Sequence, residues 1–176
     1  MGVLEVIGSS IVRIGGIKMS TKKMVKIAVV AALYAALTLG LAPISYGEIQ
    51  FRISEILVLL VIIDPIFAPG LILGCFIANF FSPLGIVDVV FGTTATAISV
   101  GLMLKTSKHL FISTLWPVIV NGLIIGIELY YAYSVPLVIG ITQVAFGEFV
   151  VVSILGYSVF KILISQKKLV SLMKSV

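Results

Sequence analysis

The chain has 176 residues, of which 60% are hydrophobic and only 11% are charged, and its mean hydropathy is +1.27. Soluble domains average about 45–50% apolar and about 25% charged residues, so this composition excludes a soluble globular protein. The net charge of +5 comes from basic residues near the ends of apolar segments, and these do not form the aromatic-interleaved patch of a nucleic-acid-binding protein. A membrane-spanning helix needs roughly 20 apolar residues, so the chain has room for six such helices and no separate soluble domain.

The N-terminal region changes character at Met19. Residues 1–18 carry little pattern, whereas Met19 opens the basic stretch Met-Ser-Thr-Lys-Lys-Met-Val-Lys, which is typical of the lead-in to a first membrane helix. No small-residue cleavage site precedes a mature soluble domain, so we expect the first helix to stay in the protein. We interpret residues 1–18 as a leader or a mis-assigned start, residues 19–170 as one six-helix membrane domain, and residues 171–176 as a cytoplasmic tail.

Six apolar segments follow along the chain, at residues 24–43, 53–64, 66–81, 86–104, 110–132 and 136–163. The second and third segments are short, and Asp64-Pro65 and Ala68-Pro69-Gly70 mark the break between them. Proline and glycine break helices and favour turns. We therefore expect either two short spans or a re-entrant hairpin, and in both cases the chain returns to the side that it left.

The basic residues predict how these segments are oriented. With a cytoplasmic N-terminus, every basic residue except Arg52 falls on the inner side. The inner residues are Arg13, Lys18, Lys22, Lys23, Lys26, Lys105, Lys108, Lys161, Lys167, Lys168 and Lys174. This distribution satisfies the positive-inside rule. The sequence thus predicts an all-α integral membrane protein with six transmembrane helices and both termini in the cytoplasm.

Six small residues recur at helical spacing on the first apolar segment: Ala28, Ala31, Ala32, Ala35, Ala36 and Gly40. Four of them form a row at every fourth position, and the other two lie directly beside it. In lipid, where packing replaces the hydrophobic effect, such residues allow close contact between helices. We interpret the row as a docking face for another membrane protein, and the alternative is ordinary packing within the six-helix body.

The acidic residues are distributed differently from the basic ones. Five of them lie in the outer half of the membrane or within the apolar segments: Glu48, Glu55, Asp88, Glu128 and Glu148. Ionisable groups within a membrane are costly and usually face a cavity or a partner. Since Arg52 alone is available to neutralise them, this asymmetry predicts a cationic or donor-rich ligand that enters from outside.

Helical geometry places several polar side chains at the depth of a binding site. With a rise of about 1.5 Å per residue from Pro136 inward, Gln143 lies about 10 Å deep and Glu148 lies near the midplane. Asn121 and Glu128 are seven residues apart and share one helix face. The candidate substrate-binding residues are Glu148, Glu128, Asn79, Asn121, Gln143, Asp88, Arg52, Glu55 and Tyr131.

Each of these side chains also has a purely structural interpretation. Glu148 and the amides can hydrogen-bond between helices, and tyrosine is enriched at membrane interfaces in any case. Asp88 can cap the fourth helix, and Arg52 can pair with Glu55 three residues further on. These alternatives are open from sequence alone.

Motifs for several kinds of chemistry are missing from the sequence. It holds no G-x-x-x-x-G-K-[ST] phosphate loop, so we do not expect the chain to hydrolyse ATP itself. His109 is the only histidine and Cys75 the only cysteine, which argues against His-based or Cys-type metal sites and against a Ser-His-Asp triad. We therefore expect no enzyme activity, no cofactor and no metal.

Four features occur together in the chain. They are the basic lead-in with its small-residue row, the stretch Gly-Glu-Ile-Gln-Phe-Arg-Ile-Ser-Glu at 47–55, the stretch Gly74-Cys75-Phe-Ile-Ala-Asn79, and Asp88 followed by Phe-Gly-Thr-Thr-Ala-Thr at 91–96. Together they resemble the QueT family, and the similarity covers nearly everything from Met19 to Lys168. The 47–55 stretch is its most specific part, whereas the small-residue row is shared with related proteins generally.

The resemblance implies a substrate-binding S component of an energy-coupling factor (ECF) transporter in a prokaryotic plasma membrane. It implies capture of a queuosine precursor, either queuine or 7-aminomethyl-7-deazaguanine. It also implies docking through the first helix on a transmembrane coupling subunit that two ATPase subunits drive.

The expected ligand agrees with the acid-rich outer half of the chain. A 7-deazaguanine offers ring N–H and amino donors that a carboxylate can accept side by side, and both ligands carry an amine that is cationic at neutral pH. We expect Glu148 or Glu128 to accept from the guanine-like edge and a second acid to meet the amine. An amide, Asn79, Asn121 or Gln143, would serve the carbonyl.

Two other functions stay open at this point. One is an S component for a different vitamin-like molecule, because a mostly apolar site with a few polar groups suits many ligands. The other is a stand-alone channel or facilitator, in which the small-residue row makes a homo-oligomer and no ATPase partner exists. A membrane enzyme is a more distant third function.

Overall fold

The computed structural model of the chain describes residues 11–14, 17–47 and 49–174. Within this part, four helical runs are long and apolar enough to cross a membrane: α2 (Thr21–Gly40), α6 (Ile86–Lys105), α7 (Leu110–Tyr133) and the run Leu137–Ser165. Two shorter apolar runs, Ile53–Ile63 and Pro65–Asn79, lie between α2 and α6 in the sequence. The prediction that each of the six apolar segments is helical is therefore confirmed.

The two shorter runs are each built from two pieces. They are η1 (Ile53–Leu59) with α4 (Leu60–Ile63), and η2 (Pro65–Phe67) with α5 (Ala68–Asn79). At the break between them, the Asp64 carboxylate accepts a hydrogen bond from the Ile66 N–H at 3.0 Å. Pro65 takes the first position of η2, where its missing N–H costs nothing. The helix break predicted at Asp64-Pro65 is thus confirmed.

The η1–α4 run lies in the interior of the molecule. Val58 and Leu59 are fully buried and join one core cluster with Leu71 and Cys75 of α5 and with Val152. The run packs against α2, α5, α6 and the final helical run. A helix that is apolar all round belongs in such an enclosed position, which explains why a segment this short is so hydrophobic.

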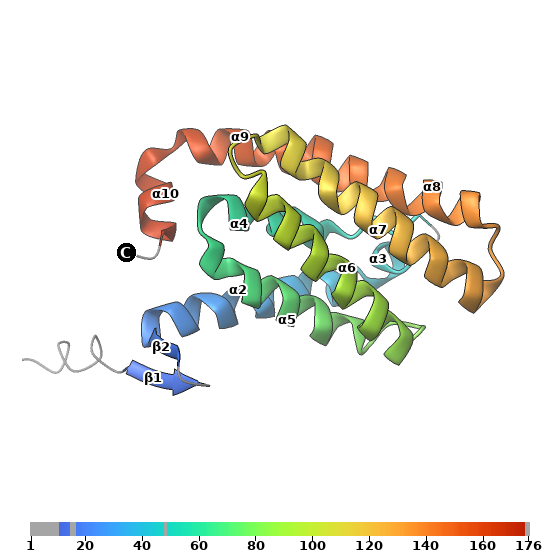
Figure 1. Ribbon diagram of the computed structural model, residues 1–176, viewed down its shortest axis with the longest axis horizontal. Helices are drawn as coiled ribbons and strands as arrows, with labels where there is room; N and C mark the ends of the chain where they lie inside the picture. The colour runs from blue at the N-terminus through green and yellow to red at the C-terminus, as the bar shows by residue number, and fades with distance from the viewer. Residues whose placement is uncertain (1–10, 15–16, 48, 175–176) are drawn as a thin grey trace, which may run out of the picture.

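The final helical run contains a π-helix between two α-helices. It comprises α8 (Leu137–Glu148), the π-helix η3 (Phe149–Gly156) and α9 (Tyr157–Ser165). After Gln166 the chain turns, and α10 (Lys167–Met173) folds away from the axis of α9 (Figure 1). The Lys26 ammonium donates to the carbonyls of Met173 at 2.8 Å and Lys174 at 3.0 Å, which ties α10 to the first turns of α2. Helical structure therefore continues into the segment expected to be a tail, of which residues 175–176 lie outside the described part.

A short antiparallel hairpin precedes α2, formed by β1 (Ile11–Ile14) and β2 (Ile17–Ser20). The hairpin lies partly within residues 1–18, which the sequence suggested to be a leader or a mis-assigned start, and its two strands are the non-helical elements among the described residues. Its β-branched residues favour strands. Ser20 then caps α2, its hydroxyl accepting from the Lys23 N–H at 3.4 Å. Residues 1–10 of the expected leader lie outside the described residues.

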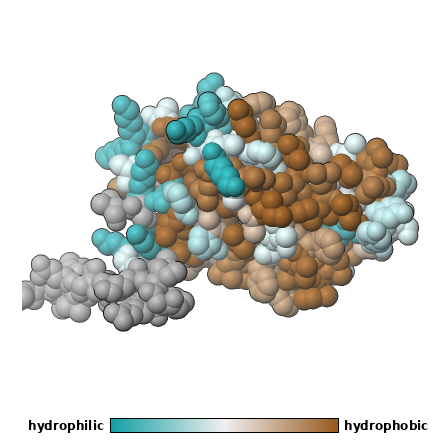
Figure 2. Space-filling model, viewed as in Figure 1, coloured by the Kyte–Doolittle hydropathy of each residue, from teal (hydrophilic) through white to brown (hydrophobic). Residues whose placement is uncertain are grey.

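The long helices run roughly along one axis of the molecule (Figure 1). One end, the α10 end, holds α10, the hairpin and the start of α2. The other, the turn end, holds α3 (Ala42–Ser45), the turn between α5 and α6, and the turn between α7 and α8. Figure 2 shows an apolar surface between the two ends and a concentration of hydrophilic residues at the α10 end.

Candidate functional site

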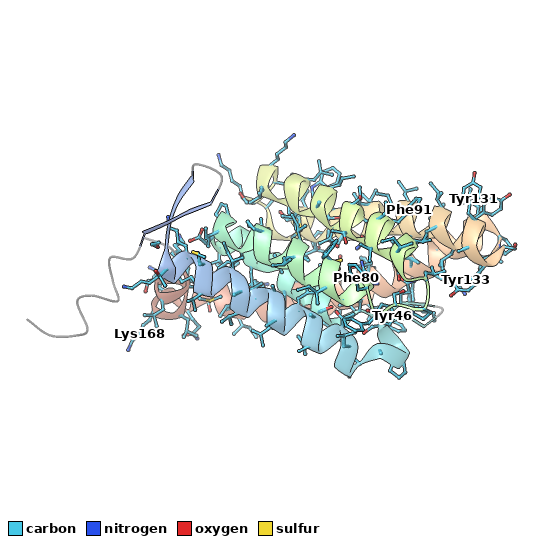
Figure 3. The ribbon with its side chains drawn as sticks, turned by 90° about the horizontal axis from the view of Figure 1, so that it is seen from below. Tyr46, Phe80, Phe91, Tyr131, Tyr133 and Lys168 are labelled. Carbon is cyan, nitrogen blue, oxygen red and sulfur yellow. The ribbon has the colours of Figure 1, made fainter. Side chains whose placement is uncertain are left out.

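A pocket of about 460 Å³ opens at the turn end of the molecule. Tyr46 and Tyr133, which line it, lie at the end opposite to Lys168 (Figure 3). The wall combines apolar surface with a few polar groups, as ligand sites do. Its residues are Tyr46, Gly47, Gln50, Ser82, Pro83, Leu84, Asp88, Leu129, Tyr133, Val135, Ile139 and Gln143.

Asp88 is the buried acid in this wall. It lies in the first turn of α6, and the Ser82 hydroxyl donates to one of its carboxylate oxygens. The same hydroxyl accepts from the Leu84 N–H at 3.1 Å, so the 82–84 turn fixes the carboxylate in place. The second oxygen, Oδ1, has no hydrogen-bond partner among the described residues. Asp88 can therefore accept a further hydrogen bond.

Glu128 of α7 lies near Asp88. Its side chain is buried, and neither of its carboxylate oxygens finds a donor in the described part of the chain. Two carboxylates close together repel each other when both are ionised, and donors from a ligand would relieve that repulsion. This arrangement suits a ligand with N–H groups or a positive charge.

Asn79 hydrogen-bonds to the main chain of Asp88. Its amide Nδ2 donates to the Asp88 main-chain carbonyl at 3.0 Å and to the Cys75 Sγ at 3.3 Å. Gly92 leaves the room for it, because a Cβ at that position would come within 2.5 Å of the Asn79 Nδ2. Asn79 does not line the pocket and acts here as a positioning residue.

Arg52 reaches the pocket through Tyr46. The Arg52 guanidinium carbon lies 5.6 Å from the centre of the Tyr46 ring, which is within cation–π range. The Tyr46 hydroxyl donates to the Ala78 carbonyl at 2.6 Å. Burial, reinforced by the nearby Asp88, raises the pKa of Tyr46 to about 12, although Arg52 opposes the shift. The tyrosine is therefore a neutral donor at physiological pH and holds the 46–52 segment against α5.

The remaining acids, Glu55 and Glu148, each have a donor for one carboxylate oxygen, while the other, Oε2, has no hydrogen-bond partner among the described residues. Glu55 accepts from the Tyr34 hydroxyl, and Glu148 accepts from the Asn121 Nδ2 at 2.8 Å. None of these four residues lines the pocket, and all are buried. In this structure they form hydrogen bonds between helices, which is the structural interpretation that the sequence left open.

The loop that closes the pocket has an unusual backbone. Gln50 lines the pocket with φ of 53°, a left-handed conformation that costs free energy in a residue other than glycine. Its neighbour packs directly on α8, since a Cβ on Gly147 would come within 2.2 Å of the Ile49 carbonyl oxygen. Gly147 therefore sets how closely this loop approaches α8.

The structure brings together only part of the predicted site. Asp88 and Gln143 line the pocket, and Glu128 lies near Asp88 without lining it. Tyr131 does not line it: the side chain is 80% exposed and points outward beside Tyr130. Four polar or aromatic wall residues lie outside the set predicted from the sequence: Tyr46, Gln50, Ser82 and Tyr133.

The small-residue row on α2 divides into two faces. Ala28, Ala32, Ala36 and Gly40 are exposed, whereas Ala31 and Ala35 are buried. Ala31 lies against α5, because a Cβ on Gly74 would come within 2.8 Å of the Ala31 carbonyl oxygen. In this structure the every-fourth row faces outward, and its two neighbours pack within the chain.

Comparison with known proteins identifies the chain. The family model described as "QueT transporter" matches residues 24–165. The chain is 33% identical to the "Queuosine precursor transporter QueT" of Lactococcus lactis subsp. cremoris over 148 residues, covering 75% of this chain and 86% of that relative. No solved structure matches the chain. Since the family model and the relative each cover most of its length, the chain belongs to the QueT transporter family.

Proposed function

We propose that this chain is the substrate-binding S component of an ATP-driven ECF importer and captures a queuosine precursor, queuine or 7-aminomethyl-7-deazaguanine. The observation that carries the proposal is the donor-poor acid pair, Asp88 and Glu128, at the pocket in a chain of a transporter family. A carboxylate pair of this kind accepts the ring N–H, amino and ammonium donors of such a ligand. The name of the Lactococcus relative supports the same substrate class.

Within the pocket we assign a role to each of the main polar and aromatic side chains. Asp88 and Glu128 accept hydrogen bonds from the ligand, and the Gln143 amide donates to its carbonyl. Tyr46 and Tyr133 bound the pocket and offer ring faces to a flat heterocycle. Glu148 and Asn121, paired with each other, support the helices behind the site.

The proposed topology has six membrane segments, with both termini in the cytoplasm of a prokaryotic cell and the pocket opening outward. The distribution of hydrophilic residues supports it, because they gather at the α10 end (Figure 2), where α10 and the first turns of α2 carry lysines. In this topology the domain runs from residue 19 to residue 170, and the short runs Ile53–Ile63 and Pro65–Asn79 together cross and return.

The exposed row on α2 is the proposed contact with a transmembrane coupling subunit, which two ATPase subunits drive. Exposed Ala28, Ala32, Ala36 and Gly40 support this, since a backbone can approach closely there. A pull-down from native membranes tests it. Recovery of a coupling subunit and ATPases supports the S component, whereas recovery of copies of this chain alone supports a stand-alone facilitator.

Calorimetric titration of the purified protein tests the substrate. Queuine and 7-aminomethyl-7-deazaguanine are the ligands, and guanine and riboflavin are the controls. We expect saturable binding of the two deazaguanines alone. Binding of riboflavin or of none of the four would overturn the substrate assignment and favour another vitamin-like ligand.

A further inference from the structure

A second pocket, of about 360 Å³, lies at the α10 end, far from the site described above. Three lysines line it together with one hydroxyl and five apolar side chains. The lining residues are Ile62, Ile63, Ser107, Lys108, Leu110, Lys161, Ile164, Val170 and Lys174.

The three lysines reach this pocket from three separate elements. Lys108 lies in the turn between α6 and α7, Lys161 lies in α9, and Lys174 follows α10. Lys26 positions the last of these, because its ammonium donates to the Lys174 carbonyl. Tyr157 lies beside Lys161, with the ammonium 5.7 Å from its ring centre. The charge is therefore concentrated by the fold and not by a single run of sequence.

The described residues at this end carry more lysines than acids. Among the residues that the structure describes, Asp64 is the acid at this end, next to Ile63 in the pocket wall. Its carboxylate already accepts the Ile66 N–H. The Ser107 hydroxyl adds a neutral donor to the wall. The pocket is therefore suited to an anion that accepts several hydrogen bonds.

The rest of the pocket is apolar and continues onto the outer surface. Ile62, Leu110 and Ile164 lie in the wall, and Leu172 of α10 is 69% exposed nearby. A free phosphate ion gains nothing from such surface, whereas a phospholipid buries its glycerol and acyl carbons there. Basic pockets between helices at a membrane face bind anionic headgroups for this reason.

We propose that this pocket binds the phosphate of an anionic phospholipid, with Lys108, Lys161 and Lys174 around the headgroup. Lipid binding there would hold α10 and the turn between α6 and α7 together at the membrane surface. The proposal requires only that the chain is embedded in a membrane, and it is independent of the identity of the transported substrate.

Native mass spectrometry of the detergent-solubilised protein tests the proposal, with phosphatidylglycerol, phosphatidylcholine and inorganic phosphate titrated separately. The test variant replaces Lys108, Lys161 and Lys174 by glutamine. A matched control replaces three exposed lysines of the same end, Lys22, Lys105 and Lys168, by glutamine. The control removes the same charge and leaves the pocket unchanged.

We expect the wild type and the control to bind phosphatidylglycerol alike, and the test variant to bind it on the order of 100-fold more weakly. Each lysine near an anionic surface contributes about fivefold, so the three single variants should show graded losses. Phosphatidylcholine should bind weakly to all. Deazaguanine binding, measured in parallel, reports on folding and on the other site.

Three results would overturn the proposal. Equal phosphatidylglycerol binding by the wild type and the test variant would exclude the pocket. An equal loss in the control would show a general effect of charge. Displacement of the lipid by millimolar inorganic phosphate would identify a small-anion site instead.

Discussion

Asp88 and Glu128 are expected to affect the stability of the empty protein and the affinity for ligand in opposite directions. Neither Glu128 oxygen has a donor within the described residues, and the Asp88 carboxyl lies nearby. A buried acceptor without a partner costs about 1–3 kcal/mol. Functional sites often retain such a cost because the ligand relieves it. The pair is therefore expected to weaken the empty protein and strengthen the complex.

Glu128→Gln should weaken deazaguanine binding by about 10- to 100-fold, because a hydrogen bond to a charged group contributes about 1.5–3 kcal/mol. Calorimetric titration measures the change. Tyr131→Phe is the matched control, since the Tyr131 side chain is 80% exposed and outside the pocket. Unchanged affinity in Glu128→Gln would contradict the pairing of this acid with the base.

The same Glu128→Gln change should stabilise the empty protein. The glutamine amide donates to Asp88 and removes the repulsion between two carboxylates, which is worth about 1 kcal/mol. For a chain of this size that raises the melting temperature by about 2–4 °C. Thermal unfolding without ligand measures it, and a lower melting temperature would mean that the pair is already satisfied in the empty state.

For individual residues, the sequence predicted the position of a side chain along its helix better than it predicted the side chains that contact it. Asn121 and Glu128 do lie on one helix, seven residues apart as expected, yet Asn121 bonds Glu148 whereas Glu128 lies near Asp88. Ser82, which holds Asp88, lies in a turn with no sequence signal beyond Ser-Pro. Side chains from separate elements meet only in the folded structure, so spacing along one element cannot identify such pairs.

The same limit applies at the scale of helices and strands. Hydropathy is a local property, and it located all six apolar runs and the break at Asp64-Pro65. The interior position of the η1–α4 run depends on which neighbours enclose it, and the sequence did not reveal that. The hairpin before α2 was missed because its strands are only four residues each.

The pocket loop packs closely on α8 because Gly147 has no side chain. Gly147→Ala should push the Ile49 carbonyl away, destabilise the fold by about 1–3 kcal/mol and lower ligand affinity. The control is Gly101→Ala in α6, where a Cβ meets nothing within 4 Å. Replacing a helical glycine there should stabilise by about 0.5–1 kcal/mol. Thermal unfolding and calorimetry of both variants measure the contrast, and equal behaviour would contradict the role of Gly147.

The exposed row on α2 gives a prediction about the proposed partner. Ala32→Trp should leave deazaguanine affinity unchanged, because Ala32 faces away from the chain, and should abolish recovery of the coupling subunit and ATPases. Val90→Trp, on the exposed side of α6, is the control with a similar bulky change. Co-purification intact in Ala32→Trp would place the contact elsewhere.

Labelling of single-cysteine variants tests the proposed orientation of the whole molecule in the membrane. Cys75 is fully buried, so the wild type should not react with a membrane-impermeant maleimide and serves as its own background. Ser134→Cys, at the turn end, should be labelled in intact cells, whereas Lys168→Cys should be labelled only after permeabilisation. The opposite labelling pattern would reverse the topology, and labelling of both in intact cells would contradict six segments.

The enclosed η1–α4 run also limits how cargo can leave. The pocket lies at the turn end, and the apolar side chains of Val58, Leu59 and Val61 fill the interior between it and the α10 end. A polar heterocycle moving straight through would have to displace that core. If the chain acts as the proposed S component, release on the far side requires either reorientation of the whole body or withdrawal of this one segment, and the proposed coupling subunit and ATPases would supply the work.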